Sequence, residues 1–276
     1  MANLLIHSMS EFSDLIVPGL MLAGADNIVE IGAEFGGMTA LLAAYCGERG
    51  GQLVSIDPEP KPEFIHWVGA QDHVEHVPLP SLDAIAQMQH VDAWVIDGDH
   101  NWYTVYNELK LVRDVCRRDG KPLLAFLHDI GWPSGRRDMY YAPDRIPAEF
   151  RHPYSHEGGC NPGHGPLRPH RGFRGMGQFA FAQHEGGPRN GVLTAIEDFV
   201  AEELVAGVEY GLAEVPGVFG LGVLFDLDAK WSGMLAQLIV PHHRNRLLQT
   251  LEDNRLLNYL EIIERQDQAV ARVAAA

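Results

Sequence analysis

The chain has 276 residues, of which 46% are hydrophobic, 9% aromatic and 21% charged, a composition that excludes a disordered or low-complexity protein. Its 37 acidic residues outnumber 21 lysines and arginines, and the net charge of −16 argues against a binder of nucleic acid or anionic membranes. No apolar run reaches the ~18 residues of a membrane span, and the N-terminus lacks the basic start of a secretory signal. Three scattered cysteines without metal-binding spacing (Cys46, Cys116, Cys160) predict a reduced, cytoplasmic protein without disulfides.

Up to about residue 130, short strand patterns alternate with helical patterns. Strands are predicted at 27–31, 52–56, 73–77, 92–96 and 122–127. Helices are predicted over MTALLAAYC, after the first strand, and over 101–118, where apolar residues recur at helical spacing. This alternation predicts a Rossmann-like α/β fold: a doubly wound, mostly parallel sheet with helices on both faces.

Residues 131–190 have a different composition. They contain 11 Gly, 8 Pro and 8 Arg but no Lys and only 5 acids, so this segment is basic while the rest of the chain is strongly acidic. A stretch of this kind within a compact domain is either a functional lid or a disordered insertion. Its tryptophan, tyrosine and phenylalanine residues, among them Trp132, Tyr140, Tyr141, Phe150, Tyr154, Phe173 and Phe179, favour a lid, because a solvated linker has few aromatics.

The C-terminal part is predicted to complete the same domain. A helix at 192–204 precedes two strand patterns, VEYGLAEVP and VFGLGVLFDL, and the Pro-Gly turn between them predicts an antiparallel hairpin. A polar helix at 242–272 could pack on the domain or on another subunit, which would make a homo-oligomer. We therefore expect a single domain over 1–276 with an inserted lid at 131–190 and no internal repeats.

A glycine-rich turn follows the first strand and opens a helix. It runs from Glu30 through Gly32 to Gly36, and Asp57 closes the second strand, 25 residues after Gly32. Glycines let a backbone approach a ligand closely, and an acid at this place can bind the two hydroxyls of a ribose. The carboxylate of Glu34, in the middle of the turn, would repel a pyrophosphate, so the pattern indicates a nucleoside without phosphates. An ordinary strand-to-helix turn with an incidental Asp57 is the competing interpretation.

This combination resembles motif I of the class I S-adenosylmethionine-dependent methyltransferases. The resemblance implies that the turn holds the methionine part of S-adenosylmethionine and that the acid of the second strand holds its ribose. The cofactor-binding residues expected from it are Glu30, Gly32, Gly36, Asp57, Ser81 and Asp97.

Acids and histidines follow the fourth and fifth strands. Because the carboxyl ends of parallel strands meet at one edge of a sheet, we expect these side chains within a few ångströms of one place: Asp97, Asp99, His100, His128 and Asp129. Crowded acids need a cation or raised pKa values, and carboxylate oxygens suit Mg²⁺ or Mn²⁺. The alternative is that Asp97 or Asp99 caps the helix beginning at residue 101, which explains one acid only.

The sequence D-G-D-H-x-x-Y, followed by H-D after the next strand, resembles the macrocin O-methyltransferase and cephalosporin-hydroxylase-like branch of that class. The resemblance implies metal binding by Asp97 and Asp129 and a general base at His100. Where this branch usually has an acid, the chain has His128. One more imidazole among the ligands shifts the expected ion from Mg²⁺ toward Mn²⁺, Fe²⁺, Co²⁺ or Zn²⁺.

Histidines and arginines gather in the 131–190 segment. They are His152, His156, His164, His170, Arg168, Arg171 and Arg174. They could capture an anionic or polar acceptor when a lid closes, or only offset the charge of the acidic body. Cys160 lies between two of these histidines, but without a second cysteine it does not indicate a zinc site.

These patterns and resemblances predict an S-adenosylmethionine-dependent O-methyltransferase that uses a divalent metal, Mg²⁺ or Mn²⁺ first, and acts on a polar small molecule such as a sugar or natural-product intermediate. An alternative is a non-haem metal oxygenase, in which His100, His128 and an aspartate form a 2-His-1-carboxylate iron centre. A third interpretation is a domain that binds the cofactor without catalysis. No nucleic-acid or membrane partner is expected.

Overall fold

Seven strands form one central sheet in the computed structural model, which describes residues 5–274. The strands are β1 (Asn27–Ile31), β2 (Gln52–Ile56), β3 (Val74–Val77), β4 (Ala93–Ile96), β5 (Leu124–His128), β11 (Tyr210–Val215) and β12 (Leu221–Asp226). Their order is β11-β12-β5-β4-β1-β2-β3. The strands from β3 to β5 pair in parallel, and β12 is antiparallel to both β5 and β11.

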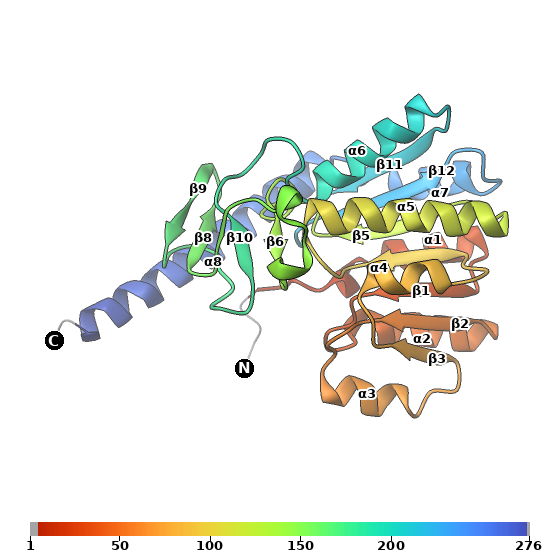
Figure 1. The fold of residues 1–276 in the computed structure, drawn as a ribbon, viewed down its shortest axis with the longest axis horizontal. Helices are drawn as coiled ribbons and strands as arrows, with labels where there is room; N and C mark the ends of the chain where they lie inside the picture. The colour runs from red at the N-terminus through yellow and green to blue at the C-terminus, as the bar shows by residue number, and fades with distance from the viewer. Residues whose placement is uncertain (1–4, 275–276) are drawn as a thin grey trace.

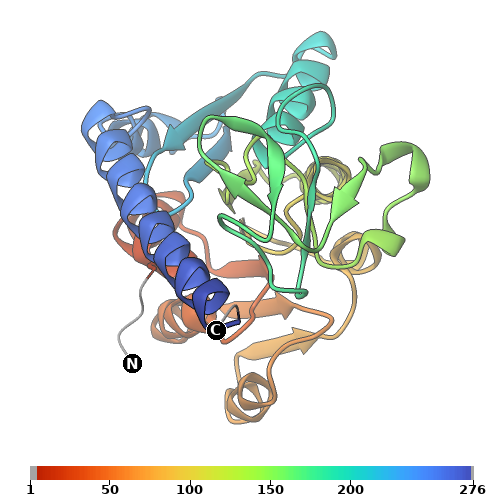
Figure 2. The ribbon, with the colours of Figure 1, turned by 90° about the vertical axis from the view of Figure 1, so that its left-hand side faces the viewer.

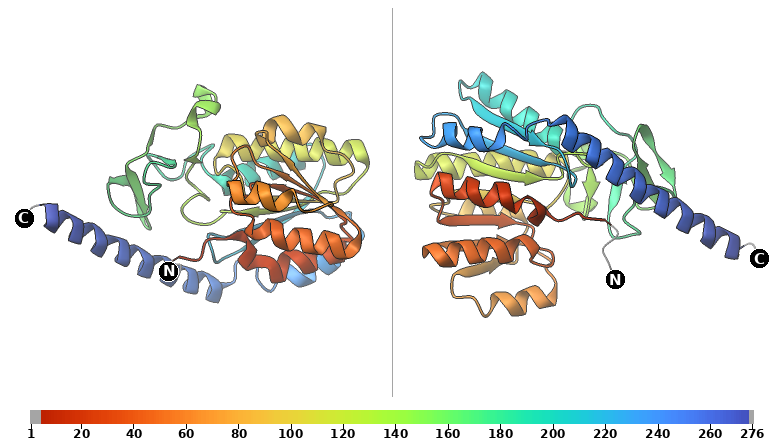
Figure 3. Two further views of the ribbon diagram at one scale, coloured as in Figure 1. Left: turned by 90° about the horizontal axis from the view of Figure 1, so that it is seen from below. Right: turned by 180° about the vertical axis from the view of Figure 1, so that it is seen from behind.

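Helices cover both faces of this sheet (Figures 1 and 3). One face packs against α1 (Ser13–Ala23), α2 (Gly37–Arg49), α3 (Pro62–Val68) and α7 (Ser232–Ile239). The other face packs against α4 (Ser81–Ala84), α5 (Trp102–Asp119) and α6 (Val192–Val205). Every residue of β4 and β5 is buried, as expected for central strands between two layers of helices.

The chain reverses its winding direction between β1 and β4. From β1 it proceeds to β2 and β3 on one side, whereas β4 and β5 lie on the other. In sheets of this type, ligands bind beyond the carboxyl ends of the strands at such a point. The glycine-rich turn after β1 and the acids after β4 both lie there.

The predicted fold is confirmed, including the antiparallel hairpin at the end of the sheet. Each predicted strand and helix has a counterpart whose ends differ by a few residues at most. Four α-helices, α1, α3, α4 and α7, were not predicted. They pack on the sheet through few side chains: α3 buries only Phe64 and Val68, and α7 only Leu235 and Ile239.

The 131–190 segment is folded and lies beyond one end of the central sheet (Figure 1). It forms a small sheet of β6 (Met139–Tyr140), β10 (Ala180–Ala182) and β7 (Tyr154–Ser155), and a hairpin of β8 (Gly158–Asn161) and β9 (His164–Pro169). The segment also contains short 3₁₀ helices at Pro143–Arg145 and Ala148–Phe150, and two others occur outside it, at Met9–Phe12 and Ile85–Gln87. Aromatic side chains fill two small cores of the segment, so the aromatic content identified a folded element rather than a linker.

The last helix, α8 (Arg246–Ala274), runs from the central sheet past the 131–190 segment (Figure 2). Its contacts with the domain include the buried residues Glu252, Leu256 and Leu260. Between residues 5 and 274, no helix is both long enough and apolar enough to cross a membrane. The structure shows α8 packed on its own chain, and a role in a homo-oligomer stays a prediction.

Candidate functional site

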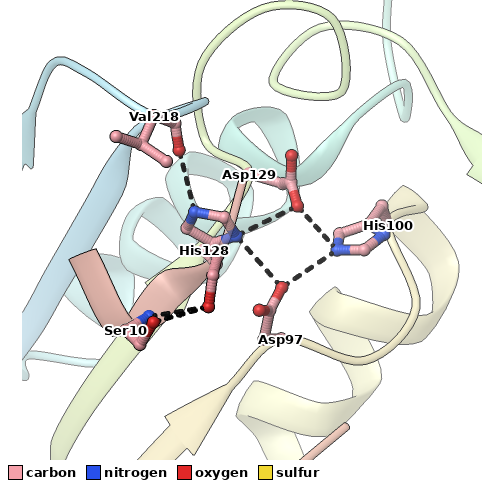
Figure 4. Close-up of polar contacts among 7 residues, drawn as sticks. Ser10, Asp97, His100, His128, Asp129 and Val218 are labelled. Atoms are coloured by element: carbon pink, nitrogen blue, oxygen red, sulfur yellow. Dashed lines mark hydrogen bonds and ion pairs between the residues drawn. The ribbon is translucent and has the colours of Figure 1, made fainter. Parts of the chain in front are cut away.

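Four side chains converge beyond the ends of β4 and β5 (Figure 4). They form what we call the acid–histidine cluster, made of Asp97, His100, His128 and Asp129. His100 Nε2 lies 2.9 Å from Asp129 Oδ2 and 3.3 Å from Asp97 Oδ1. His128 Nδ1 lies 3.1 Å from Asp97 Oδ1 and 3.2 Å from Asp129 Oδ2. Each carboxylate therefore faces both imidazoles, and each imidazole faces both carboxylates.

The spacing of these atoms fits a metal ion. Asp97, His100 and Asp129 each offer a ligand atom within 4.8 Å of the others, and His128 Nδ1 contacts two of the three. The two imidazoles and two carboxylates also suit a transition ion chemically. The residues present thus fit a divalent metal, by geometry and by donor type.

Electrostatics couple the four groups. Burial alone would lower the pKa of His100, but the carboxylates of Asp129 and Asp97 outweigh it and raise this pKa to about 10. Burial also opposes the charge of His128, and the same carboxylates raise its pKa well above the usual value. In return, both imidazoles hold the pKa of Asp97 and Asp129 below the usual range, although burial opposes this. Positive charge between the carboxylates is therefore favoured, and protons or a divalent ion can supply it.

A hydrogen bond fixes the orientation of His128. Its ring is buried, and Nε2 lies 2.8 Å from the carbonyl oxygen of Val218, to which it donates. With Nε2–H donated to Val218, Nδ1 is the nitrogen that faces the cluster, and losing its proton would give it a lone pair for a metal ion. Metal-binding histidines are typically oriented by a second hydrogen bond of this kind.

His100 presents one nitrogen to the cluster and leaves the other without a partner. Nε2 faces Asp97 and Asp129, whereas Nδ1 is buried and has no hydrogen-bond partner in the structure. The backbone of His100 is held by the 131–190 segment, because the Met139 amide donates to the His100 carbonyl at 2.9 Å. The ring of Tyr141, from the same segment, lies 5.9 Å from that of His100. No sequence pattern marked Tyr141 as a site residue, since it lies in an irregular stretch.

Asp99 lies near the cluster, as predicted, because it lines the same small cavity as Asp97, His100 and His128, but its carboxylate bonds elsewhere. Its Oδ2 accepts a hydrogen bond from Thr104 Oγ1 at 3.1 Å, in the first turn of α5. The alternative role as helix cap is wrong for Asp97 and Asp99, because Asn101 is the N-cap and accepts from the Thr104 amide. Asp99 lies two residues beyond Asp97 in a loop, where strand periodicity no longer dictates the side-chain direction.

The glycine-rich turn packs directly against the backbone of Asp97. Gly32 has a φ of 87°, and a Cβ built on it would lie 2.2 Å from the carbonyl oxygen of Asp97. The Asp97 amide donates to the carbonyl of Ile31 at 2.8 Å. The turn and the cluster are therefore neighbours at the same end of the sheet. Gly36, with a φ of 80°, is the N-cap of α2.

Gly32 should consequently be intolerant of any side chain. We expect Gly32→Ala to lower the free energy of unfolding by at least about 3 kcal/mol, because a left-handed conformation and an immobile carbonyl both oppose the methyl group. Gly24→Ala is the matched control: Gly24 has a φ of 63° but open space around it, so only about 1 kcal/mol should be lost. Urea denaturation measures both values, and equal losses would show that close packing does not constrain Gly32.

Two acids fasten the turn. Asp57 Oδ2 accepts hydrogen bonds from the amides of Ala33 and Glu34 at 2.9 and 3.0 Å, and its Oδ1 accepts from the Glu59 amide at 2.8 Å. Glu30 is buried, and its Oε2 accepts from the hydroxyls of Thr39 and Ser55, both at 2.7 Å. Glu30 Oε1 is buried without a partner, and burial raises the pKa of this carboxyl to about 7.

Ser81 begins α4, after the loop that follows β3. Among the described residues, neither carboxylate oxygen of Glu108, a residue of α5 that sequence analysis did not select, has a hydrogen-bond partner. Glu108 is fully buried, and burial raises its pKa to about 7. A glutamate within an amphipathic helix gives no sequence signal of such an environment.

Part of the chain resembles a known protein family. Residues 29–130 match the model of a family described as a methyltransferase domain. This match identifies residues 29–130 as a methyltransferase domain. The matched range of the methyltransferase domain begins in β1 and ends just after Asp129, so it contains the glycine-rich turn and the whole acid–histidine cluster.

Among curated proteins no sequence matches the chain. Several solved structures resemble it at low identity. An O-methyltransferase from Bacillus cereus in complex with SAH is 18% identical, with a TM-score of 0.46, over 81% of this chain and 84% of that one. TomG from Streptomyces achromogenes is an O-methyltransferase involved in tomaymycin synthesis and was solved with SAM. It is 15% identical, with a TM-score of 0.46, over 80% of this chain and 82% of that one. A putative caffeoyl-CoA O-methyltransferase from Staphylococcus aureus is 12% identical, with a TM-score of 0.44, over 77% and 81%.

The 131–190 segment is anchored to the methyltransferase domain at its base. Asp138 Oδ1 accepts hydrogen bonds from the amides of Trp102, at the start of α5, and Gly191, before α6, both at 2.7 Å. Together with the bond between Met139 and His100, these contacts make the segment a fixed wall beside the cluster in this structure.

Two of the three predicted lid arginines are paired with acids of α8. Arg171 lies 3.1 Å from Glu264, and Arg174 lies 2.5 Å from Asp267. The charges of Arg171 and Arg174 therefore offset acids of the same chain, which was one of the two interpretations of the basic residues. Arg168, His164 and His170 are exposed, and capture of an acceptor by them stays a prediction.

Proposed function

We propose that the chain is an O-methyltransferase that uses a divalent metal ion and acts on a polar small molecule, such as a sugar or natural-product intermediate. The observation that carries the proposal is the acid–histidine cluster itself. Asp97, His100 and Asp129 each offer a ligand atom within 4.8 Å of the others, and His128 Nδ1 contacts both carboxylates. The cluster adjoins the glycine-rich turn of a methyltransferase domain. A metal site next to the methyl donor is where an acceptor hydroxyl could be bound and aligned.

S-adenosylmethionine would lie along the carboxyl ends of β1, β2 and β4. In the proposal, the backbone at Gly32 and Gly36 leaves room for the methionine part, and the unpartnered Oε1 of Glu30 is available to its amino group. Asp57 accepts the two ribose hydroxyls, since each carboxylate oxygen can accept more than one hydrogen bond. Ser81 and Asp97 are the further cofactor contacts that we propose.

The metal would be held by Asp97, His128 and Asp129. A divalent ion bound there lowers the pKa of a coordinated hydroxyl. The Val218 carbonyl keeps His128 Nδ1 directed at the ion's position. Because imidazole nitrogen is a better donor to transition ions than to Mg²⁺, we propose that Mn²⁺ or another transition ion competes well with Mg²⁺.

His100 is our candidate for the general base that removes the acceptor's proton. Its Nε2 also lies among the potential ligand atoms, and one lone pair cannot bind a metal and accept a proton at the same time. The two roles differ in what they affect: a ligand contributes to metal affinity, and a base contributes to turnover at saturating metal.

Asp57→Ala should weaken the binding of S-adenosylhomocysteine severely, by roughly 2–5 kcal/mol, because two charge-assisted hydrogen bonds to ribose are lost. Isothermal titration calorimetry measures this, and denaturation confirms that the variant is folded. Asp72→Ala, which removes an exposed acid from a loop away from the turn, is the matched control and should bind normally. Unchanged affinity in Asp57→Ala would exclude Asp57 from the cofactor site.

Thermal-shift measurements test the whole proposal. A ligand that binds only the folded state raises its stability by mass action. We expect S-adenosylhomocysteine and Mn²⁺ each to raise the Tm, and both together to raise it further. A Tm that responds to S-adenosylhomocysteine but to no divalent ion would remove the metal from the proposal.

One observation favours a second candidate function. The two imidazoles and a carboxylate of the cluster also satisfy the 2-His-1-carboxylate ligand set of non-haem iron oxygenases. The glycine-rich turn and the methyltransferase-domain match favour methyl transfer, since an oxygenase does not need that turn. Consumption of O₂ by the Fe²⁺-loaded protein, without added S-adenosylmethionine, would support the oxygenase instead.

A further inference from the structure

The turn between β11 and β12 has an unusual backbone. Four consecutive residues have positive φ: Gly217 at 110°, Val218 at 43°, Phe219 at 65° and Gly220 at 90°. For the glycines this conformation is readily accessible, but for a phenylalanine and above all a β-branched valine it is strained, at roughly 1–3 kcal/mol each. Such a turn persists only when surrounding groups hold it.

A buried carboxylate of α8 holds the turn between β11 and β12 in this conformation. Glu252 Oε2 accepts a hydrogen bond from the Val218 amide, and Oε1 accepts one from the Phe219 amide, both at 3.0 Å. Successive amides in the left-handed conformation form a concavity that binds anions. Arg255 donates to both oxygens at 2.6 Å, and its guanidinium lies 4.9 Å from the centre of the Phe219 ring. Although burial opposes it, Arg255 and the two amides lower the pKa of Glu252, so the carboxylate is charged.

The carbonyl groups of the same two residues point the other way, toward the end of β5. The Val218 carbonyl accepts from His128 Nε2 at 2.8 Å (Figure 4), and the Phe219 carbonyl accepts from the Gly131 amide at 2.6 Å. The turn therefore contacts the chain on both sides of Asp129. One peptide segment links the carboxylate of α8 to the acid–histidine cluster.

We propose that Glu252 is a positioning residue for the metal site: by holding the Val218–Phe219 turn, it fixes the carbonyl that orients His128 Nδ1 toward the metal. This inference rests on the proposed function as far as the metal is concerned. Its structural part, the orientation of the His128 ring, does not depend on a metal.

Glu252→Gln tests the inference. Glutamine has a similar size but only one acceptor oxygen, and its NH₂ group would face an amide donor and Arg255. We expect the affinity for Mn²⁺, measured by calorimetry on the full chain, to fall about 10- to 100-fold, as for other groups that orient metal ligands. The His128 Nε2–H signal in NMR spectra of the metal-free protein should shift or broaden. Glu261→Gln, on the exposed face of the same helix in an ion pair with Arg265, is the matched control and should change neither.

A second substitution separates positioning from a general loss of stability. Val218→Gly keeps the carbonyl that binds His128 but removes the strain that Glu252 offsets. In the Glu252→Gln background it should therefore restore a large part of the Mn²⁺ affinity. If Glu252 only stabilised α8, Val218→Gly would restore nothing, and that result would overturn the proposal.

The two readouts also distinguish this inference from the proposed function. Unchanged Mn²⁺ affinity together with an unchanged His128 signal in Glu252→Gln would refute the positioning role while leaving the metal site intact. If the unsubstituted protein bound no divalent ion but Glu252→Gln still altered the His128 signal, the metal would be refuted and the positioning of His128 would stand.

Discussion

Asp97→Ala should reduce the affinity for Mn²⁺ by more than about 100-fold and abolish turnover. Asp97 lies between the two imidazoles of the cluster, 3.3 Å from His100 and 3.1 Å from His128. Without its carboxylate, the ion loses a charged ligand and both imidazoles lose an acceptor. Calorimetry with Mn²⁺ and a methyl-transfer assay measure the two effects.

Asp99→Ala is the matched control for Asp97→Ala. It removes the same group two residues further along the same loop, but its carboxylate bonds to Thr104 instead of the cluster. Its affinity for Mn²⁺ should be unchanged. Equal losses in the two variants would mean that the loop, and not the ligand atom, determines metal binding.

His100→Ala should lower kcat by roughly 10²–10⁴ while leaving the affinity for S-adenosylhomocysteine nearly unchanged. The reduction should persist at saturating Mn²⁺, because a missing base cannot be replaced by more metal. Without an ion, Asp129 and Asp97 raise the pKa of His100 to about 10, and a divalent ion between these carboxylates would oppose that rise. We therefore expect an acid limb in the pH–rate profile of the metal-loaded, unsubstituted enzyme. It should disappear in the variant, since the group whose protonation causes it is gone.

The kinetics of His100→Ala can also contradict the role of His100 as general base. If saturating Mn²⁺ restored kcat in His100→Ala, His100 would be a metal ligand, as its Nε2 position among the carboxylates also allows. If kcat were near the native value with the same acid limb at all Mn²⁺ concentrations, His100 would have neither role. The bonds of its backbone to the 131–190 segment would then be the reason for its position.

Much of the fold could be predicted from the sequence because its central strands carry strong local signals. Runs such as Asn27–Ile31 and Ala93–Ile96 are short, apolar and followed by glycine or acid, and their alternation with helices permits few topologies. The convergence of Asp97, His100, His128 and Asp129 followed from the same topology, since parallel neighbours end at one edge. The direction of Asp99 could not be derived, because it depends on local loop geometry and on Thr104.

The fold of the 131–190 segment and the role of Glu252 depend on contacts between distant segments, which no local pattern encodes. The strands of the 131–190 segment are two to six residues long and lie in a stretch rich in glycine and proline, so they show no periodicity. Glu252 looks like an ordinary acid of a polar helix, yet it binds backbone amides 33 and 34 residues away. Backbone groups leave no trace in a sequence, and neither does the positive φ of Val218.

The central claim is that a divalent ion and the methyl donor bind side by side at the ends of β1, β4 and β5. Anomalous diffraction from crystals grown with Mn²⁺ and S-adenosylhomocysteine tests it most directly. We expect one manganese peak about 2 Å from Asp97 Oδ1, Asp129 Oδ2 and His128 Nδ1, with the ribose on Asp57. A map without a manganese peak in the cluster, in which the imidazoles still contact the carboxylates directly while the cofactor is bound, would contradict the metal-dependent mechanism.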